Sequence, residues 1–220
     1  MRSVRRWAGG LLPGAAARRL QVVEFAAAWR ESNEAALSTV GPLWVALGDS
    51  TGQGIGASAW NRGYVGQLLE RLRRERDPTW TVVNLSRSGA RVADVLDEQV
   101  PALGTTPRVR LVTCAVGAND LLRADERRVR ADLARLVTEL PGGAVLATLP
   151  QGIRPARAAA HNAFIVERAS ALALVVADVW AYTAPPWRGK VSADHFHPND
   201  YGYADWTAAF ADAVGLGGTT

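Results

Sequence analysis

A serine and a histidine lie far apart in the chain, each in a setting that suits nucleophilic catalysis. Ser50 follows Gly48 and Asp49 after an apolar run, a place where a side chain can stand clear of the backbone. His197 comes three residues after Asp194, a spacing that lets a carboxylate in a turn reach Nδ1 of the imidazole. The other ring nitrogen, Nε2, could then take the proton from the Ser50 hydroxyl. These residues are a candidate catalytic triad.

The same chemistry requires hydrogen-bond donors for the negative charge that develops on a carbonyl oxygen. Gly89 could offer an unobstructed backbone N–H, and Asn119 could offer a side-chain amide N–H. Together with the backbone N–H of Ser50, they predict a three-donor oxyanion hole. Asp49 and Asp120 adjoin two of these residues, and we expect them to accept backbone N–H groups that hold the turns.

Other interpretations of Ser50 exist. Serine is favoured at helix N-caps, so the residue could simply begin a helix. The glycine-rich run over residues 50–54 could also cradle a phosphate, which would make the chain a non-catalytic phosphate- or sugar-binding module. That run lacks the Lys-Ser/Thr ending of a P-loop. The binding module also leaves Asn119 and His197 unexplained, so we favour the catalytic interpretation.

Two further side chains near Asp194 are candidates for the site. His195 directly follows Asp194 and competes with His197 as the base. Adjacent side chains generally point apart, whereas a spacing of three across a turn brings them together, so we favour His197. Trp187 lies in a proline-rich loop that leads to Asp194 and could contact the substrate in an acyl pocket.

Apolar runs alternate with longer amphipathic runs along most of the chain. This pattern predicts buried parallel strands separated by helices that cover both faces of one sheet. We therefore expect an α/β fold: a three-layer α/β/α sandwich, flavodoxin-like, with a five-stranded parallel sheet. The expected strands cover residues 43–47, 81–85, 109–116, 144–149 and 171–177. The expected helices between and after them cover residues 63–76, 92–100, 126–140, 154–169 and 200–214.

This arrangement explains how distant residues could share one site. Ser50, Gly89 and Asn119 each come just after an expected strand. Because sites in open parallel sheets form at the carboxyl ends of the strands, the three turns should meet at one edge of the sheet.

Composition narrows the function further. The chain has 220 residues, a formal net charge of +4 and a single cysteine, Cys114, within an apolar run. One cysteine excludes an internal disulfide, and no His, Cys and carboxylate spacing suggests a metal site, so we expect no metal and no cofactor. The basic excess lacks the aromatic-interleaved patch of a nucleic-acid reader, so we expect no nucleic-acid partner.

The N-terminal region is predicted as a flexible tail over residues 1–20 and a leading helix over residues 21–40, followed by the main domain over residues 41–220. Its basic start and alanines resemble a signal peptide, but only Leu11 and Leu12 are strong hydrophobes there. We therefore expect a cytoplasmic protein, with export as the alternative. No apolar stretch is long enough to span a membrane, so no stable membrane insertion is expected.

Four segments, in order, resemble the conserved blocks of the SGNH (GDSL) hydrolase family. They are residues 45–50, 84–89, 116–120 and 194–198. The resemblance implies a flavodoxin-like fold and esterase, lipase or acylhydrolase activity on a small-molecule ester. It implies that Ser50, Asp194 and His197 are catalytic, and that Gly89 and Asn119 complete the oxyanion hole. One position departs from the family pattern, because Ser86 stands where the second block often has a glycine.

The family acts on lipids, thioesters and acetylated sugars, so the resemblance leaves the substrate open. The connections between the expected elements are short, and no large lid is available to bury a long acyl chain. We therefore expect short acyl or acetyl groups. The oligomeric state is not predicted.

Overall fold

The computed structural model describes residues 13–123 and 125–216. Five strands form one parallel sheet in the order β2-β1-β3-β4-β5. This is the strand order of flavodoxin-like folds, so the predicted fold class is confirmed. The strands are β1 Leu43–Gly48, β2 Thr81–Asn84, β3 Val109–Ala115, β4 Val145–Ala147 and β5 Val175–Ala177.

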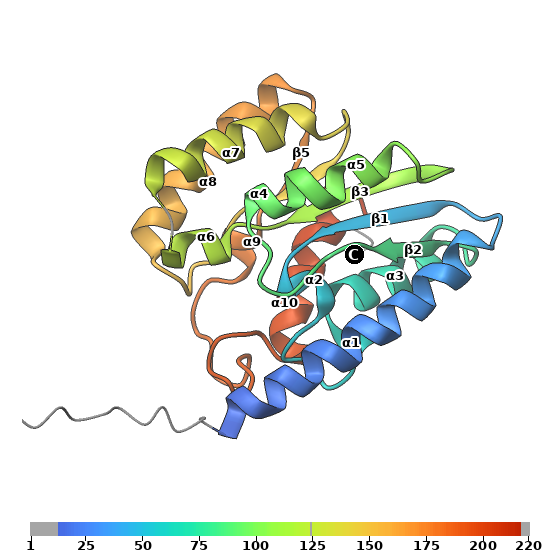
Figure 1. The fold of residues 1–220 in the computed structure, drawn as a ribbon, viewed down its shortest axis with the longest axis horizontal. Coiled ribbons are helices and arrows are strands. Elements are labelled where there is room, and N and C mark those ends of the chain that lie inside the picture. The colour runs from blue at the N-terminus through green and yellow to red at the C-terminus, as the bar shows by residue number, and fades with distance from the viewer. Residues whose placement is uncertain (1–12, 124, 217–220) are drawn as a thin grey trace, which may run out of the picture.

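Helices connect the strands and cover both faces of the sheet (Figure 1). The longer helices are α1 Pro13–Leu37, α3 Tyr64–Glu75, α7 Glu126–Glu139, α8 Pro155–Ala171 and α10 Asp200–Ala213. The shorter ones are α2 Ser50–Gln53, η1 Trp60–Arg62, α4 Val92–Asp94, the π-helical η2 Val95–Gln99, α5 Val100–Leu103, α6 Ala118–Arg123 and α9 Val179–Tyr182. Within residues 13–123 and 125–216, no helix is both long and apolar enough to cross a bilayer.

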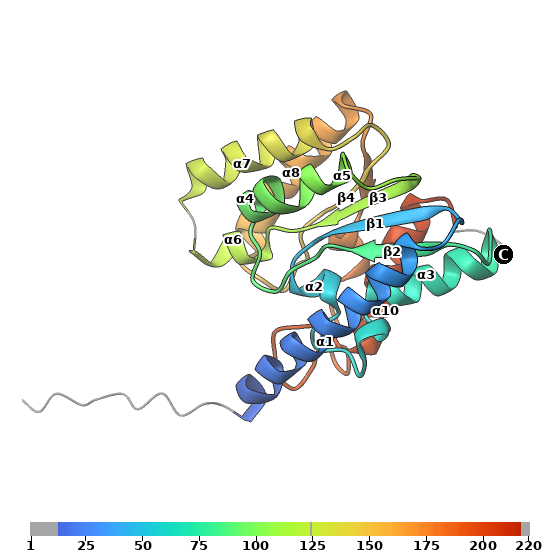
Figure 2. The ribbon, with the colours of Figure 1, turned by 45° about the vertical axis from the view of Figure 1, so that its right-hand side comes forward.

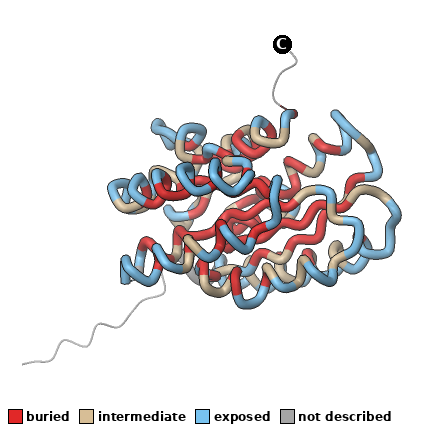
Figure 3. Tube along the Cα trace, turned by 90° about the horizontal axis from the view of Figure 1, so that it is seen from above, coloured by how far each residue is buried: buried red, intermediate tan, exposed pale blue. Residues whose placement is uncertain are grey.

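The sheet is the buried middle layer (Figure 3). Alternate residues of β1 enter two different hydrophobic clusters, one on each face of the sheet. Leu43, Val45 and Leu47 pack with side chains of η2, α7 and α8. Trp44 and Ala46 pack with side chains of α3 and α10. Strand side chains alternate between the two faces of a sheet. A strand that is apolar throughout, such as β1, is therefore covered by helices on both faces.

Helix α1 lies along the outer edge of the sheet, beside β2 (Figure 2). Its Asn33 side chain accepts the backbone N–H of Asn84 at 2.8 Å and donates to the carbonyl of the same residue at 2.9 Å. An amide side chain thus takes the place of a neighbouring strand at this position. This satisfies backbone groups that an open sheet edge would leave unpaired.

The N-terminal boundary differs from the prediction. α1 begins at Pro13, so residues 13–20, expected in a flexible tail, are helical. Proline suits the first turn of a helix, and the following alanines, arginines and leucine are strong helix formers. The rest of the expected tail, residues 1–12, lies outside the described residues.

Two strand boundaries also differ. β5 begins at Val175, because the alanine-rich helix α8 continues to Ala171, where the prediction began the strand. β4 ends before Leu149, whose N–H and C=O both bond the Asn162 side chain, at 2.7 and 3.0 Å. At the end of β4, a side-chain amide thus replaces the strand ladder.

Candidate active site

The turn after β1 presents Ser50 at the carboxyl edge of the sheet. Gly48 adopts a φ of 153°, and a Cβ atom there would collide with the carbonyl oxygen of Ala115 on β3. Only glycine allows this approach. Asp49 caps the short helix α2, because its Oδ1 accepts the backbone N–H and the hydroxyl of Thr51, at 2.9 Å each. Ser50 is therefore the first residue of a helical turn.

The structure brings Ser50, His197 and Asp194 together, although 147 residues separate the serine from the histidine. His197 Nε2 lies 2.9 Å from Ser50 Oγ, and His197 Nδ1 lies 2.6 Å from Asp194 Oδ2. The ring that meets Asp194 is that of His197, as the spacing of three predicts. The three side chains form one continuous hydrogen-bonded chain from carboxylate to hydroxyl.

Asp194 is held in its charged form. Burial by itself would raise the pKa of this carboxyl, but several hydrogen bonds outweigh it and lower the pKa well below its ordinary value. Besides the His197 ring, the donors to Oδ1 are the Ser192 hydroxyl at 2.8 Å and the backbone N–H groups of Phe196 and His197 at 2.9 Å each. Asp194 is therefore an acceptor for an imidazole N–H at neutral pH.

Gly89 lies in the loop after β2 and Asn119 lies in the short helix α6 after β3, and the two segments contact each other. Asn119 Nδ2 donates to the carbonyl of Ala90, the residue after Gly89, at 2.9 Å. Gly89 is exposed, has a φ of 81°, and has no atom within 4 Å of the position where a Cβ would lie. The backbone near Gly89 is thus open to an incoming group, while Asn119 lines a cavity that Ser50 also lines.

Asp49, next to Ser50, and Asp120, next to Asn119, accept backbone N–H groups, as their positions predict. Asp120 Oδ2 accepts the backbone N–H of Val92 at 3.1 Å and so ties helix α6, after β3, to the start of helix α4, after β2. Burial raises the pKa of Asp120 to about 6, with the Val92 N–H and Arg91 opposing the shift. Burial also raises the pKa of Asp49, opposed by its bonds from Thr51.

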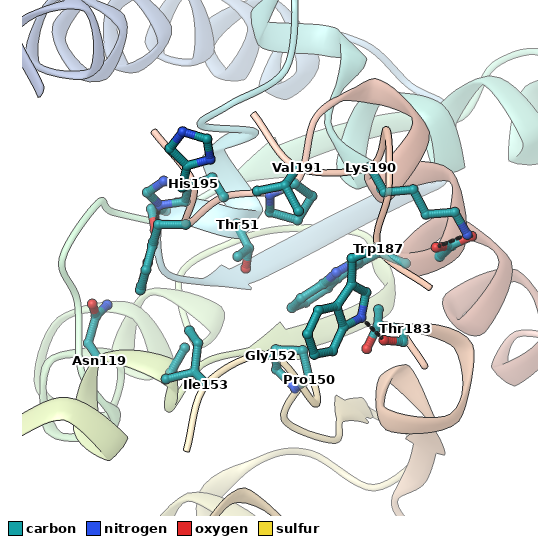
Figure 4. A pocket seen from close by; sticks show the side chains of 18 residues that line it. Thr51, Asn119, Pro150, Gly152, Ile153, Thr183, Trp187, Lys190, Val191 and His195 are labelled. Carbon is teal, nitrogen blue, oxygen red and sulfur yellow. Dashed lines mark hydrogen bonds and ion pairs between the residues drawn. The ribbon is translucent and has the colours of Figure 1, made fainter. Parts of the chain in front are cut away.

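A cavity of about 270 Å³ opens beside Ser50 (Figure 4). Trp187 forms part of its wall, and the indole Nε1 donates to the carbonyl of Thr183 at 2.8 Å, which fixes the ring. The predicted rival base, His195, also lines the cavity and has a left-handed φ of 56°. Half of the other lining side chains are apolar, among them Pro150, Ile153, Val191, Phe196 and Trp206.

An ion pair lines the same cavity on the side of Trp187 that is opposite to Asn119 (Figure 4). Lys190 Nζ lies 2.7 and 3.0 Å from the two carboxylate oxygens of Asp205. Both side chains are partly buried. The cavity therefore runs from an amide, past an indole ring, to a charged pair.

Sequence reasoning missed the side-chain amides that hold the site's loops. Gln99 accepts the N–H of Gly48 at 2.8 Å and donates to the carbonyl of Gly48 at 2.9 Å, from 51 residues further along the chain. Gln53 accepts the N–H of Ser88 at 2.8 Å, next to Gly89. A glutamine in an amphipathic run looks like any exposed polar residue. The π-helical turn η2 that ends at Gln99 gives no local sequence signal.

A parallel sheet in this strand order, with a hydrogen-bonded Asp–His–Ser chain at its carboxyl edge, defines a hydrolase of the SGNH type. The chain matches the GDSL-like Lipase/Acylhydrolase family over residues 46–204, most of its length, and it belongs to that family. The resemblance carried by the four sequence blocks is thereby confirmed.

Solved structures with the same fold include several esterases. TesA is 23% identical, with a TM-score of 0.65, 78% of this chain covered and 97% of that chain. The acetylxylan esterase Axe2 from Geobacillus stearothermophilus is 21% identical, with a TM-score of 0.65, and the match covers 80% of this chain and 95% of Axe2. The psychrotrophic esterase EstA from Pseudoalteromonas sp. is 18% identical, with a TM-score of 0.63, and the match covers 80% of this chain and 98% of EstA. At these identities the likeness establishes the fold. The chain matches none of the curated proteins with which it was compared.

Proposed function

We propose that this protein is a serine ester hydrolase that cleaves carboxylic esters through an acyl-Ser50 intermediate. The observation that carries the proposal is the chain of hydrogen bonds from Asp194 through His197 to Ser50, at 2.6 and 2.9 Å. Membership of the GDSL-like family supports the same class of reaction. Because Asp194 is ionised, it favours the protonated imidazole that forms when the serine proton moves to His197.

The reaction proceeds in two halves. His197 Nε2 takes the proton of the Ser50 hydroxyl as Oγ attacks the ester carbonyl carbon. The tetrahedral intermediate collapses, the alcohol leaves with the proton from His197, and an acyl ester on Ser50 remains. His197 then takes a proton from water, the resulting hydroxide attacks the acyl carbon, and the carboxylic acid departs while Ser50 regains its proton.

Three donors stabilise the oxyanion in both halves of this mechanism. They are the backbone N–H of Ser50, the backbone N–H of Gly89 and the side-chain amide of Asn119. The first N–H groups of a helical turn have no intrahelical partner, which suits Ser50 at the start of α2. The left-handed, uncovered backbone of Gly89 supports its role as a donor to substrate.

The cavity beside Ser50 supports a short acyl group on the substrate. Trp187 supplies an apolar wall, and its bond to Thr183 keeps the indole in place. A long alkyl chain would extend to Lys190 and Asp205 and strip water from a charged pair, without offering any hydrogen bond in return. We propose that Trp187 contacts the substrate and that acetyl to butyryl esters are preferred.

Ser50→Ala and a fluorophosphonate probe test the mechanism. The purified protein should release p-nitrophenol from p-nitrophenyl acetate, and Ser50→Ala should lower kcat by more than about 10⁴-fold. Intact-mass analysis should show one probe adduct on the wild type and none on Ser50→Ala. An active Ser50→Ala variant would sink the mechanism. A protein that resists labelling but binds phosphate or a sugar would support the non-catalytic binding module instead.

A series of p-nitrophenyl esters tests the acyl preference. The value of kcat/KM should fall beyond butyrate, because longer chains reach the Lys190–Asp205 pair. In a Lys190→Met/Asp205→Leu variant, the optimum should move to longer chains. A wild-type optimum at octanoate or beyond would contradict the short-acyl proposal while leaving the serine mechanism standing.

A further inference from the structure

Helix α1 turns one face toward the loops of the site. Gln21, Phe25, Trp29 and Asn33 recur at intervals of four, so they lie along a single stripe of the helix. Phe25 and Trp29 are buried between the two amides. This helix precedes residues 46–204, which match the family, and Figure 2 shows it running past α2 beside β2.

The first amide of this stripe holds the loop that follows the nucleophile turn. Gln21 Oε1 accepts the backbone N–H of Gly56 at 2.8 Å, and Gln21 Nε2 donates to the carbonyl of Ala57 at 2.8 Å. Bonds to two successive residues fix both the position of the loop and the plane of its peptide groups. Gln21 is itself partly buried, which limits competition from water.

Gly56 lies directly against His197. It has a φ of 98°, and a Cβ atom added there would lie 2.8 Å from His197 Cβ and collide with the carbonyl oxygen of Pro198. The backbone of Gly56 is therefore a wall behind the histidine, and Gln21 sets the position of that wall. A shift of Gly56 would leave His197 free to move away from Ser50.

Other residues of α1 contact the two ends of the hydrogen-bonded series Asp194–His197–Ser50. Trp29 Nε1 donates to the carbonyl of Gln53, the last residue of the helical turn that begins with Ser50, at 3.1 Å. Arg18 Nη1 lies 4.0 Å from Asp194 Oδ2. One rigid helix thus contacts the turn that carries the nucleophile, the wall behind the base, and the carboxylate.

We propose that Gln21 is a positioning residue for His197: by holding Gly56 and Ala57, it keeps the imidazole within hydrogen-bond distance of Ser50. The inference rests on the proposed ester hydrolysis, because its effect is on proton transfer between these two side chains. Displacing a reacting group by about 1 Å can lower a rate by about 10²-fold, so loss of one support should be visible in kcat. In the proposed mechanism the substrate contacts the cavity and not Gln21, so loss of the Gln21 amide should leave KM unchanged.

Gln21→Met tests this role, because methionine keeps the length of the side chain and removes both hydrogen bonds. Glu24→Met is the matched control, since Glu24 is an exposed residue of the same helix. With p-nitrophenyl acetate, Gln21→Met should lower kcat about tenfold, leave KM within about twofold, and slow fluorophosphonate labelling of Ser50 by the same factor as kcat. Glu24→Met should match the wild type.

Thermal unfolding of each variant shows whether it is folded at the assay temperature. A folded Gln21→Met variant with wild-type kcat would overturn the inference and leave only a stabilising role for the amide. If Gln21→Met does not fold, Gln21→Glu decides, since it keeps the acceptor for the Gly56 N–H and removes the donor to Ala57. A lower kcat at unchanged KM supports positioning by Gln21, and an unchanged kcat overturns it. A wild type that neither hydrolyses esters nor reacts with the probe would overturn the proposed function itself.

Discussion

The two sides of Ser50 are built in different ways. On the side of the proposed proton transfer, Asp194 and His197 are three residues apart. A bond of 2.6 Å joins these two side chains, and a bond of 2.9 Å joins His197 to the serine. On the proposed oxyanion side, Gly89 comes from the loop after β2 and Asn119 from helix α6 after β3, and a bond from Asn119 to the residue after Gly89 connects them. The Asp194–His197 pair is a local sequence motif, whereas Gly89 and Asn119 lie near Ser50 only because β2 and β3 flank β1.

Electrostatics separates the two sides as well. Hydrogen bonds outweigh burial at Asp194 and lower its pKa, so charge is favoured beside His197. Burial outweighs hydrogen bonds at Asp120, next to Asn119, and raises its pKa to about 6. Thus the proposed proton transfer would be supported by a stable anion, while the proposed oxyanion donor Asn119 adjoins a carboxyl for which ionisation is costly. Separate substitutions can disturb each side without the other.

Asp194→Asn should have the largest effect on the side of proton transfer. An asparagine can donate to the imidazole and stabilise the wrong tautomer, and it cannot balance the charge of a protonated His197. We expect kcat for p-nitrophenyl acetate to fall about 10⁴-fold. Circular dichroism should show an unchanged fold. A loss smaller than about tenfold would mean that other contacts orient His197.

Asn119→Ala should have the next largest effect, on the oxyanion side. Removing one oxyanion donor typically lowers kcat by about 10²- to 10³-fold, with little change in KM. Leu122→Ala on the same short helix α6 is the control, because Leu122 is exposed. Equal losses in the two variants would point to a disturbed helix α6 and not to a lost donor.

Asp120→Asn should change stability in a pH-dependent way. The pKa of Asp120 rises from 3.8 to about 6 on folding, so the folded state binds the proton more tightly than the unfolded state. Wild-type stability should therefore fall as pH rises from about 4 to 6, by up to about 3 kcal/mol. Asparagine can still accept the Val92 N–H and carries no charge.

Urea unfolding at several pH values measures this difference. Asp120→Asn should be more stable than the wild type at pH 7 to 8, and the two proteins should converge near pH 4. Parallel stability curves across this range would contradict the assignment of the shift to Asp120.

His195→Asn should have the smallest effect. Asparagine tolerates the left-handed φ of 56°, and the substitution removes the rival imidazole. We expect kcat to stay within about twofold of the wild type, because the ring that meets Asp194 and Ser50 is that of His197. A loss comparable with that of His197→Asn would reverse the assignment of the base.

Much of the architecture was predictable because strands and helices have different periods. The runs at residues 43–47 and 81–85 became β1 and β2 with boundaries shifted by one residue. Errors arose where propensity and context compete: alanines extend α8 through the start of the predicted fifth strand, and α1 begins before the expected leading helix.

The supporting side chains of the site were not predictable in the same way. The Gln99 side chain accepts the N–H of Gly48, 51 residues away in sequence. The Gln21 side chain accepts the N–H of Gly56, 35 residues away. An amide can bond any nearby backbone group, so its residue type carries no information about its partner. The partner depends on where helices dock on the sheet.

The sequence by itself determined the sheet, the family and the side chains that could do chemistry, because periodicity and short motifs are local properties of a chain. The tertiary structure alone decided how those side chains are supported. It placed Gly56 behind His197, brought Lys190 and Asp205 to the lining of the cavity, and packed α1 against the loops of the site. The physical reason is that hydrogen bonds and packing act over a few ångströms in space, whereas the residues they join are tens of positions apart in sequence.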